Sequence, residues 1–325
     1  MLFSDNKMDC HRCHGCGLCV MVCPVWHQRS DVRCTPNGYA RVMQCGVEPD
    51  IRDVFSCIMC GACSSICPQQ IDLLDVFSSL RKQMIHNEDL QETKARLMDS
   101  LKQHASTTAN ARSRNDSGRM LLAGKALRDR PEIMDRVIEL LGVQCADDDG
   151  TDIVHALEMG VAIPESRQRV FLDSLKKADE LIVSDGLMKH ALQQWLPAMR
   201  IQSTGQALTT LPQVREKIGN DDLYVIESRS YNTDFEQAVD FYDQLQRQQG
   251  CQLNLDLHRL AIPTGGVSQD ARGHDHEFDS QKQAEWVVTG RKIKRIIVES
   301  LEDGIQLSGL NHYPVIHVSE LVMAV

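Results

Sequence analysis

The chain has 325 residues, of which 42% are hydrophobic and 25% are charged, and its net charge at pH 7 is -10. This composition is ordinary for a folded globular protein, and the length is sufficient for about two domains. The excess of negative charge argues against a nucleic-acid partner, because binding to phosphates draws most of its affinity from clustered lysine and arginine.

The start of the chain, Met1–Lys7, carries neither the positive segment nor the apolar run of a secretory signal. No stretch approaches the roughly 20 apolar residues that cross a bilayer as a helix. We therefore expect a cytoplasmic protein that has no membrane span and associates with a membrane only through a partner. In a reducing cytoplasm, densely spaced cysteines indicate metal ligation or redox chemistry rather than disulfides.

Cysteine is the unusual component of this sequence. Thirteen cysteines are present, and eleven of them fall within the first 67 residues. Two runs follow the pattern C-x2-C-x2-C-x3-C-P, which is typical of 4Fe-4S ligation in ferredoxins. The first run consists of Cys13, Cys16, Cys19 and Cys23, and the second of Cys57, Cys60, Cys63 and Cys67. Structural zinc is the alternative, but zinc sites usually use paired C-x2-C ligands that close one tetrahedron.

The spacing also predicts how the cysteines are shared. Three thiolates two residues apart lie on one tight loop, whereas the fourth cysteine, which precedes a proline, ligates the other cluster in two-cluster proteins. We therefore predict two 4Fe-4S clusters with crossed ligands. Cluster 1 is assigned to Cys13, Cys16, Cys19 and Cys67, and cluster 2 to Cys57, Cys60, Cys63 and Cys23. Cys10 extends the spacing upstream without completing the pattern, so we interpret Cys10, Cys34 and Cys45 as spare thiols.

Helices are predicted next along the chain. Apolar residues at helical spacing indicate a helix over residues 71–80 that packs back on the cysteine-rich module. A polar helix is predicted over residues 88–104, and residues 107–118 have the composition of a linker. A further helix is predicted over residues 119–142, where Gly142 is a suitable C-cap.

The rest of the chain alternates short apolar runs with amphipathic helices. The predicted strands are Leu181–Val183, Leu223–Ile226, Arg295–Val298 and Pro314–Val318. Such alternation indicates an α/β layer structure. The strands at Leu181 and Arg295 each precede a predicted helix, so we interpret the two halves as weak internal repeats.

The predicted fold class is therefore α+β, with an N-terminal α-helical two-cluster domain followed by an α/β domain. We divide the chain into residues 1–85 for the cluster domain, 86–118 for a helix and linker, and 119–325 for the α/β domain. The repeated halves of that domain are expected over about 140–218 and 219–325. The loop at His274–His276 is interpreted as solvated rather than metal-binding, and no phosphate-binding loop is found.

At its cysteine runs the chain resembles the helical-ferredoxin iron-sulfur subunits of heterodisulfide reductases, anaerobic glycerol-3-phosphate dehydrogenase, glycolate oxidase and lactate-utilisation complexes. The 33 residues between Cys23 and Cys57 exceed what a compact bacterial ferredoxin needs, which implies inserted helices. In that family a pair of CCG modules often follows, whose adjacent cysteines bind an unusual cluster or substrate. Residues 177–185 and 261–266 are similar to the segments that carry those cysteines, but here they contain none.

The resemblance implies a function as well as a fold. The chain is expected to be an electron-transfer iron-sulfur subunit that relays single electrons through two 4Fe-4S clusters, without a catalytic site of its own. Its expected partners are other redox subunits, either a flavoprotein or a heterodisulfide-reductase-like subunit. Two alternatives stay open. One is a catalytic heterodisulfide-reductase-like subunit, which needs more cysteines than the isolated Cys145 and Cys251 provide. The other is a scaffold whose clusters are structural.

Overall fold

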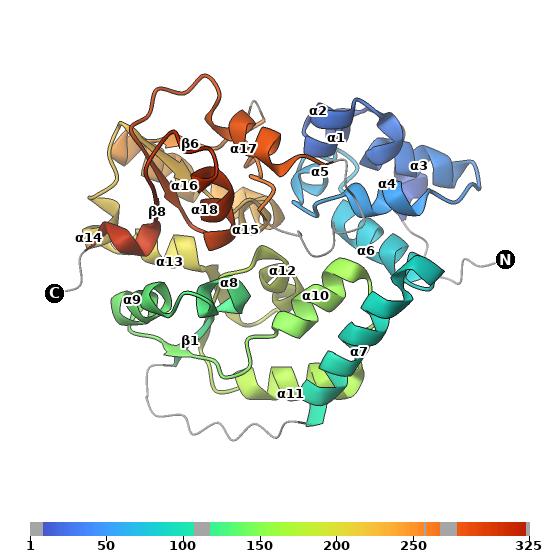
Figure 1. Cartoon of the computed structure of the whole chain (residues 1–325), viewed down its shortest axis with the longest axis horizontal. Coiled ribbons are helices and arrows are strands. Elements are labelled where there is room, and N and C mark those ends of the chain that lie inside the picture. Colours follow the sequence, from blue (N-terminus) through green and yellow to red (C-terminus); the bar gives the residue numbers. More distant parts are fainter. Residues whose placement is uncertain (1–8, 107–117, 257, 267–277, 323–325) are drawn as a thin grey trace.

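The computed structural model describes residues 9–106, 118–256, 258–266 and 278–322 (Figure 1). It combines a helical N-terminal module with two α/β halves, which confirms the α+β class. Within these residues, no helix is long and apolar enough to cross a membrane. Residues 107–117 of the predicted linker and the His274–His276 loop lie outside the described residues.

The N-terminal module consists of short helices. They are η1 (Asp9–Arg12), α1 (Leu18–Met21), α2 (Pro24–Arg29), η2 (Val32–Cys34), α3 (Pro36–Gln44), α4 (Ile51–Ser56), α5 (Ala62–Ser65) and α6 (Leu73–Met84). Of these, α2, η2, α3 and α4 fill the long gap between the two cysteine runs, as predicted. Pro24 and Pro36 occupy the first helical position, where the missing N–H costs no hydrogen bond. Asp72 caps α6 by accepting from the backbone N–H groups of Leu74 and Asp75.

Helix α6 confirms the helix predicted over residues 71–80 and extends it by one turn. Its buried face packs on Tyr39 and Val54, with the rings of Tyr39 and Phe77 edge to face at 4.9 Å. The polar helix is confirmed as η3 (Glu88–Leu90) followed by α7 (Gln91–Ser106), which packs on α10 and α11 of the first α/β half. Leu101 anchors that contact in the shared core.

The two halves have the same topology. The first half contains β1 (Arg119–Leu122), α8 (Gly124–Arg128), α9 (Pro131–Leu141), β2 (Gln144–Cys145), α10 (Thr151–Met159), α11 (Glu165–Leu175), β3 (Glu180–Val183), α12 (Gly186–Trp195), β4 (Arg200–Ser203), α13 (Thr204–Thr210) and α14 (Pro212–Arg215). The second half contains β5 (Asp222–Val225), α15 (Ser228–Thr233), α16 (Phe235–Gln249), β6 (Gln252–Leu253), α17 (Ser280–Val288), β7 (Arg295–Val298), α18 (Leu301–Ser308), β8 (Val315–His317) and η5 (Val318–Leu321). Each half forms a parallel four-stranded sheet, in the orders β2-β1-β3-β4 and β6-β5-β7-β8.

Even the central strand pairs correspond between the halves. Arg119 at the start of β1 pairs with Glu180 at the start of β3, and their side chains form an ion pair of 2.7 Å. In the second half Asp222 of β5 occupies the same register position opposite Arg295 of β7, at 2.6 Å and with the charges exchanged. The internal repetition inferred from the strand pattern therefore extends to strand order and register.

The prediction of helix at the start of the first half was wrong. Residues Arg119–Leu122 form strand β1, and only α8 and α9 of that segment are helical, the latter ending at Gly142 with a left-handed backbone as predicted. The first sheet thus begins near residue 119 rather than 140. Four-residue β1 runs directly into a helical pattern, and β2 and β6 have two residues each, so no strand period is detectable in the sequence.

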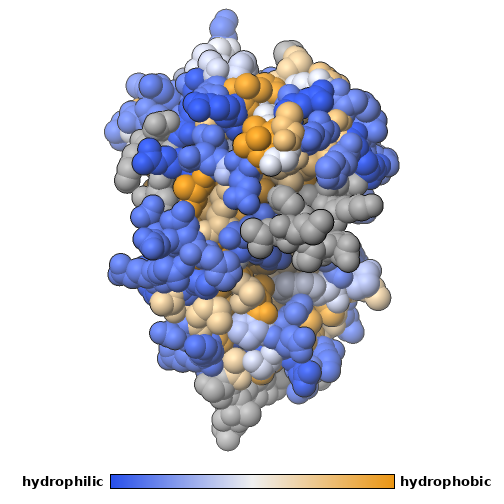
Figure 2. All heavy atoms as spheres, turned by 90° about the vertical axis from the view of Figure 1, so that its right-hand side faces the viewer, coloured by the Kyte–Doolittle hydropathy of each residue, from blue (hydrophilic) through white to orange (hydrophobic). Residues whose placement is uncertain are grey.

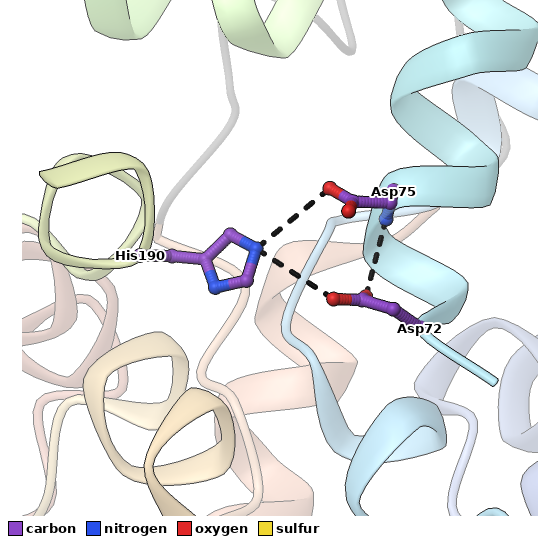
Figure 3. Close-up of side chains that lie close together, drawn as sticks. All are labelled: Asp72, Asp75 and His190. Atoms are coloured by element: carbon purple, nitrogen blue, oxygen red, sulfur yellow. Dashed lines mark hydrogen bonds and ion pairs between the residues drawn. The ribbon is translucent and has the colours of Figure 1, made fainter. Parts of the chain in front are cut away.

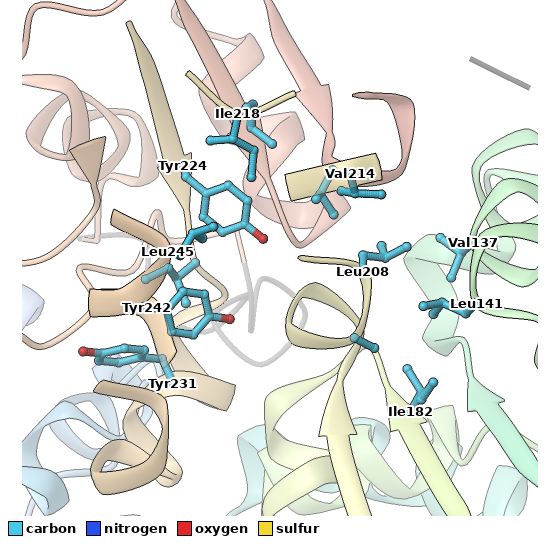
Figure 4. Close-up of a cluster of buried hydrophobic side chains, with 14 of the residues drawn as sticks. Val137, Leu141, Ile182, Leu208, Val214, Ile218, Tyr224, Tyr231, Tyr242 and Leu245 are labelled. Atoms are coloured by element: carbon cyan, nitrogen blue, oxygen red, sulfur yellow. The ribbon is translucent and has the colours of Figure 1, made fainter. Parts of the chain in front are cut away.

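Both sheets are buried on both faces, as parallel sheets usually are. One shared core joins the halves: Ile182 of β3 and Tyr224 of β5 belong to it, together with Leu141 of α9 and Leu208 of α13 (Figure 4). The opposite faces are covered by α10 and α11 in the first half and by α17 and α18 in the second. This arrangement brings the two sheets together and directs the ends of several strands toward a common space.

Candidate iron-sulfur sites

Site 1 is a small cavity in the N-terminal module that is lined by thiols. Its lining includes Cys13, Cys16 and Cys19 from the first run and Cys67 from the second. Cys16 is exposed and the other three are half-buried. Gly17 caps α1 with a left-handed backbone at φ 79°, a conformation that glycine adopts without strain, and so lets the loop turn sharply at the cysteines.

Site 2 is a second thiol-lined cavity, deeper in the molecule. It is lined by Cys57, Cys60 and Cys63 from the second run and by Cys23 from the first. Cys60 and Cys63 are buried, and Gly61 between them has a left-handed backbone at φ 77°. The structure therefore brings together the same two groups of four cysteines that the crossed-ligand pattern predicts.

The surplus cysteines have different surroundings. Cys10 is buried and lines site 1, so it stays an alternative thiol at that site. Cys34 is buried and lines site 2, but its S–H donates to Asp53 at 3.2 Å and its sulfur accepts from Arg29 at 3.5 Å. Cys45 is exposed at the end of α3. Cys145 is the last residue of β2 in the first sheet, and Cys251 directly precedes β6 of the second sheet.

Burial keeps the thiols protonated in the absence of metal. It raises the pKa of Cys60 and of Cys19 to about 12, and it also raises the pKa of Cys23 and Cys63. Neighbouring thiols add to the shift at Cys19 and Cys63. Iron binds the deprotonated thiolate, so assembly at these sites must release protons and should become more favourable as the pH rises.

A buried arginine lies next to site 2, and its positive charge indicates whether the site suits an anionic group. Arg81 of α6 is 0% exposed, and among the described residues its guanidinium forms no ion pair in contact with a carboxylate, although the negative charge of Glu158 acts on it through space. Its guanidinium donates to the carbonyl oxygens of Cys57 and Glu158, each at 2.5 Å. An isolated buried cation is costly unless an anion compensates it. A 4Fe-4S cluster on four thiolates carries net negative charge, so the residues around site 2 fit such a group.

Two side chains of α15, from the second α/β half, also reach the site 2 loop. Arg229 donates to the carbonyl oxygen of Ile58 at 3.3 Å and to the carboxylate of Glu158 at 2.6 Å. Asn232 donates to the carbonyl oxygen of Cys60 at 2.9 Å. Arg81, Arg229 and Asn232 were missed in the sequence. Only Arg81 had a signal there, because it lies one residue beyond the helix predicted over 71–80 and seven residues after Leu74, the spacing of one helix face.

Site 1 has a more exposed environment. Gln44 donates to the carbonyl oxygens of Cys10 and Cys13 at 2.9 and 2.7 Å. Arg41, an exposed residue, donates to the carbonyl oxygen of His14 at 3.0 Å. The guanidinium of Arg41 at the site 1 loop is thus solvated, whereas those of Arg81 and Arg229 at the site 2 loop are buried.

His190 of α12 joins the N-terminal module to the first α/β half. Its Nε2 lies 3.9 Å from a carboxylate oxygen of Asp72 and 3.8 Å from one of Asp75, both at the start of α6 (Figure 3). Burial opposes protonation of His190, but the bond to Asp75 and the two negative charges outweigh it and raise its pKa. The same bond lowers the pKa of Asp75. His190 therefore forms an ion pair with Asp72 and Asp75 that links the first α/β half to the N-terminal module.

This ion pair predicts a pH-dependent contribution to stability. The raised pKa of His190 stabilises the fold below its unfolded value of about 6.5, and this stabilisation is lost as the pH rises through the folded value. The lowered pKa of Asp75 adds stability above about pH 4, which is lost on acidification. Because Asp75 is 59% exposed, we expect less than about 1 kcal/mol.

Denaturant unfolding of the native chain and of His190→Gln at pH 5.5 and pH 8.5 checks this prediction. The free energy of unfolding should differ more between the two proteins at pH 5.5. An equal difference at both pH values would contradict it.

Comparison with known proteins agrees with the geometry of the two sites. Residues 9–71 match the family model described as a 4Fe-4S dicluster domain. No curated protein and no solved structure matches the chain. The matched segment contains all ten cysteines that line sites 1 and 2, including the eight of the two runs. The N-terminal module is therefore a ferredoxin-like iron-sulfur domain that binds 4Fe-4S and supports electron transfer.

Proposed function

We propose that the chain is an electron-transfer subunit that relays single electrons through two 4Fe-4S clusters within a multi-subunit oxidoreductase. When bound, such a cluster supplies one-electron chemistry at a potential set by nearby charge, hydrogen bonds and solvent exposure. The proposal is carried by one observation: each thiol-lined cavity combines three cysteines of one run with the fourth of the other. The ligands would be Cys13, Cys16, Cys19 and Cys67 at site 1, and Cys57, Cys60, Cys63 and Cys23 at site 2.

The test is anaerobic purification followed by iron and sulfide analysis and low-temperature EPR. We expect about eight irons per chain and a reduced spectrum in which two neighbouring centres interact. About four irons per chain, or zinc, would contradict the two-cluster relay. Centres that resist reduction across the cellular range of potentials would favour the scaffold alternative instead.

The cations at site 2 predict how its potential responds to mutation. Reduction adds a negative charge, which a buried cation stabilises. In Arg81→Met the side chain keeps its approximate volume and loses its charge, and the midpoint potential of site 2 should fall by roughly 50 to 100 mV, since an interaction of about 2 kcal/mol corresponds to that range for one electron. An EPR-monitored redox titration measures the shift for each centre.

Arg41→Met is the matched control for this experiment. Arg41 donates to the site 1 loop from an exposed position, so solvent screens its charge and the site 1 potential should change much less. Thermal unfolding of Arg81→Met checks that its fold is kept, because the substitution also removes the hydrogen bonds to the carbonyl oxygens of Cys57 and Glu158. An unchanged site 2 potential in Arg81→Met would refute the electrostatic role.

Site 1 is the more accessible place for a redox partner, such as a flavoprotein or a heterodisulfide-reductase-like subunit. Cys16 is exposed there, and Met21 at the end of α1 is 53% exposed, whereas the site 2 cysteines are half-buried or buried. Figure 2 shows a mostly hydrophilic face with small hydrophobic patches in its upper part, where the N-terminal module lies. Isolation of native complexes and identification of the bound subunits tests this part of the proposal.

We further propose that the α/β part is a pair of CCG-like modules that have lost their cysteines. In this division of the chain, the N-terminal module is one unit and α7 with the linker that follows it is another. The shared strand order and register of the two halves support this interpretation. The catalytic alternative is less well supported. Cys145 and Cys251 lie in different sheets, and neither lines the large cavity between the halves.

A further inference from the structure

A cavity of about 740 Å³ lies between the two α/β halves. The last residues of β1, β3 and β7, namely Leu122, Val183 and Val298, form part of its wall. In parallel α/β sheets, ligands bind in the crevice at the carboxyl ends of the strands. The volume is within the range of sites for small organic ligands.

The charge of the wall indicates the sign of the ligand. The wall contains the carboxylates of Asp129, Asp149, Glu158, Asp185, Glu302 and Glu320 and the cations of Lys125, Arg130 and Arg229. Lys125 and Arg130 are exposed, and Arg130 is engaged with Glu132 at 2.5 Å. The interior of the cavity therefore has more negative than positive charge.

Glu302 is a wall carboxylate without an ion pair among the described residues, as are Glu320 and the exposed Asp129. Glu158 pairs with Arg229 at 2.6 Å and Asp149 with Arg128 at 2.5 Å. Half-buried Glu302 accepts only from the hydroxyl of Ser300 at 2.8 Å and has no cation partner within the described residues. His317, which lines both this cavity and the recess beside it, is kept neutral because burial lowers the pKa of His317 to about 4. Within the described part of the chain, no side chain therefore supplies a positive charge to Glu302.

A second observation marks the same place. Glu302, Ser184, His317 and Thr204 line a recess of about 10 Å³, about the size of one water or one ammonium group, and the recess shares most of these residues with the large cavity. Thr204 is 2% exposed, and its hydroxyl has no hydrogen-bond partner in the described structure. A buried hydroxyl without a partner costs free energy unless a ligand or water satisfies it. The recess thus offers a hydroxyl acceptor beside a carboxylate.

The rest of the cavity suits a hydrocarbon chain. Ile133 of α9, Val154 of α10 and Met188 of α12 contribute apolar side chains to the wall. We infer that the cavity binds an organic cation, a primary amine whose ammonium group lies against Glu302 and Thr204 and whose apolar body lies along these side chains. This inference rests on the α/β halves and is independent of the number of clusters.

The test uses three probes of equal chain length: hexylammonium, hexanol and hexanoate. Binding to the purified full chain is measured by titration calorimetry at constant ionic strength. We expect hexylammonium to bind more tightly than hexanol and hexanoate to bind least. Glu302→Gln keeps the bond to Ser300 and should weaken hexylammonium binding by about 10- to 100-fold, the range of a charged hydrogen bond, with little change for hexanol.

Asp129→Asn is the matched control, because it removes one negative charge at the exposed rim of the same cavity and should leave the affinity within about twofold. Thr204→Val should weaken binding several-fold, which gives a second measurement if Glu302→Gln does not fold. Absence of hexylammonium binding, equal affinity for hexylammonium and hexanol, or an equal effect of Asp129→Asn and Glu302→Gln would each overturn the inference.

Discussion

Replacing Cys67 by alanine is expected to remove the cluster at site 1, although the other three thiols of that site lie more than 40 residues earlier in the chain. Alanine offers no ligand atom, and a cluster held by three thiolates on one loop loses its fourth anchor. The iron content should fall from about eight to about four per chain, and the EPR signal that remains should be that of site 2. Cys23→Ala should have the mirror effect and leave site 1.

Two controls make this prediction specific. Cys45→Ala removes an exposed thiol that lines neither cavity and should keep both centres. Cys10 lines site 1, so Cys67→Ala is repeated with Cys10→Ala to exclude replacement of one thiol by the other. If Cys67→Ala kept site 1 and lost site 2, each run would supply all four ligands to its own cluster, and the crossed arrangement would be wrong.

Anaerobic removal of iron with a chelator should unfold the N-terminal module while both sheets stay folded. The eight thiols hold loops from the two runs together, and without metal the pKa of Cys60 at about 12 leaves protonated sulfurs that make no such link. The cores around β1, β3, β5 and β7 are formed largely by residues outside that module. Hydrogen exchange followed by mass spectrometry should show complete loss of protection in peptides from residues 9–71.

The same experiment should show a graded effect where the module meets the rest of the chain. Protection of α15 should decrease, because α15 packs on α5 and Asn232 donates to the site 2 loop. Peptides from β3 and β7 should stay protected, and iron with sulfide under reducing conditions should restore the original pattern. Unchanged protection of residues 9–71 after complete removal of iron would mean that the helical core around Phe77 is sufficient for folding.

The grouping of the run cysteines around sites 1 and 2 was predictable because its signal is local. Three cysteines two residues apart lie on one loop whatever the rest of the fold, and the long gap between the runs indicated the inserted helices α2 to α4. Helix α6 was also predictable, since its buried residues repeat over three turns. Strands β2 and β6 were not, because two residues establish no pattern. Strand β1 runs into a helical pattern, and β4 lacks the apolar run that marks β3, β5 and β7 of the same length.

The sequence by itself determined the chemistry of the N-terminal module, because cysteine spacing is a property of adjacent residues. Only the tertiary structure decided which charges surround that chemistry and where a ligand cavity lies. Arg229 donates to the carbonyl oxygen of Ile58, which lies 171 residues earlier in the sequence. Glu302 and Thr204 come from different α/β halves, and they line one recess because the two halves pack together. Such contacts depend on packing between distant elements, and no local pattern encodes them.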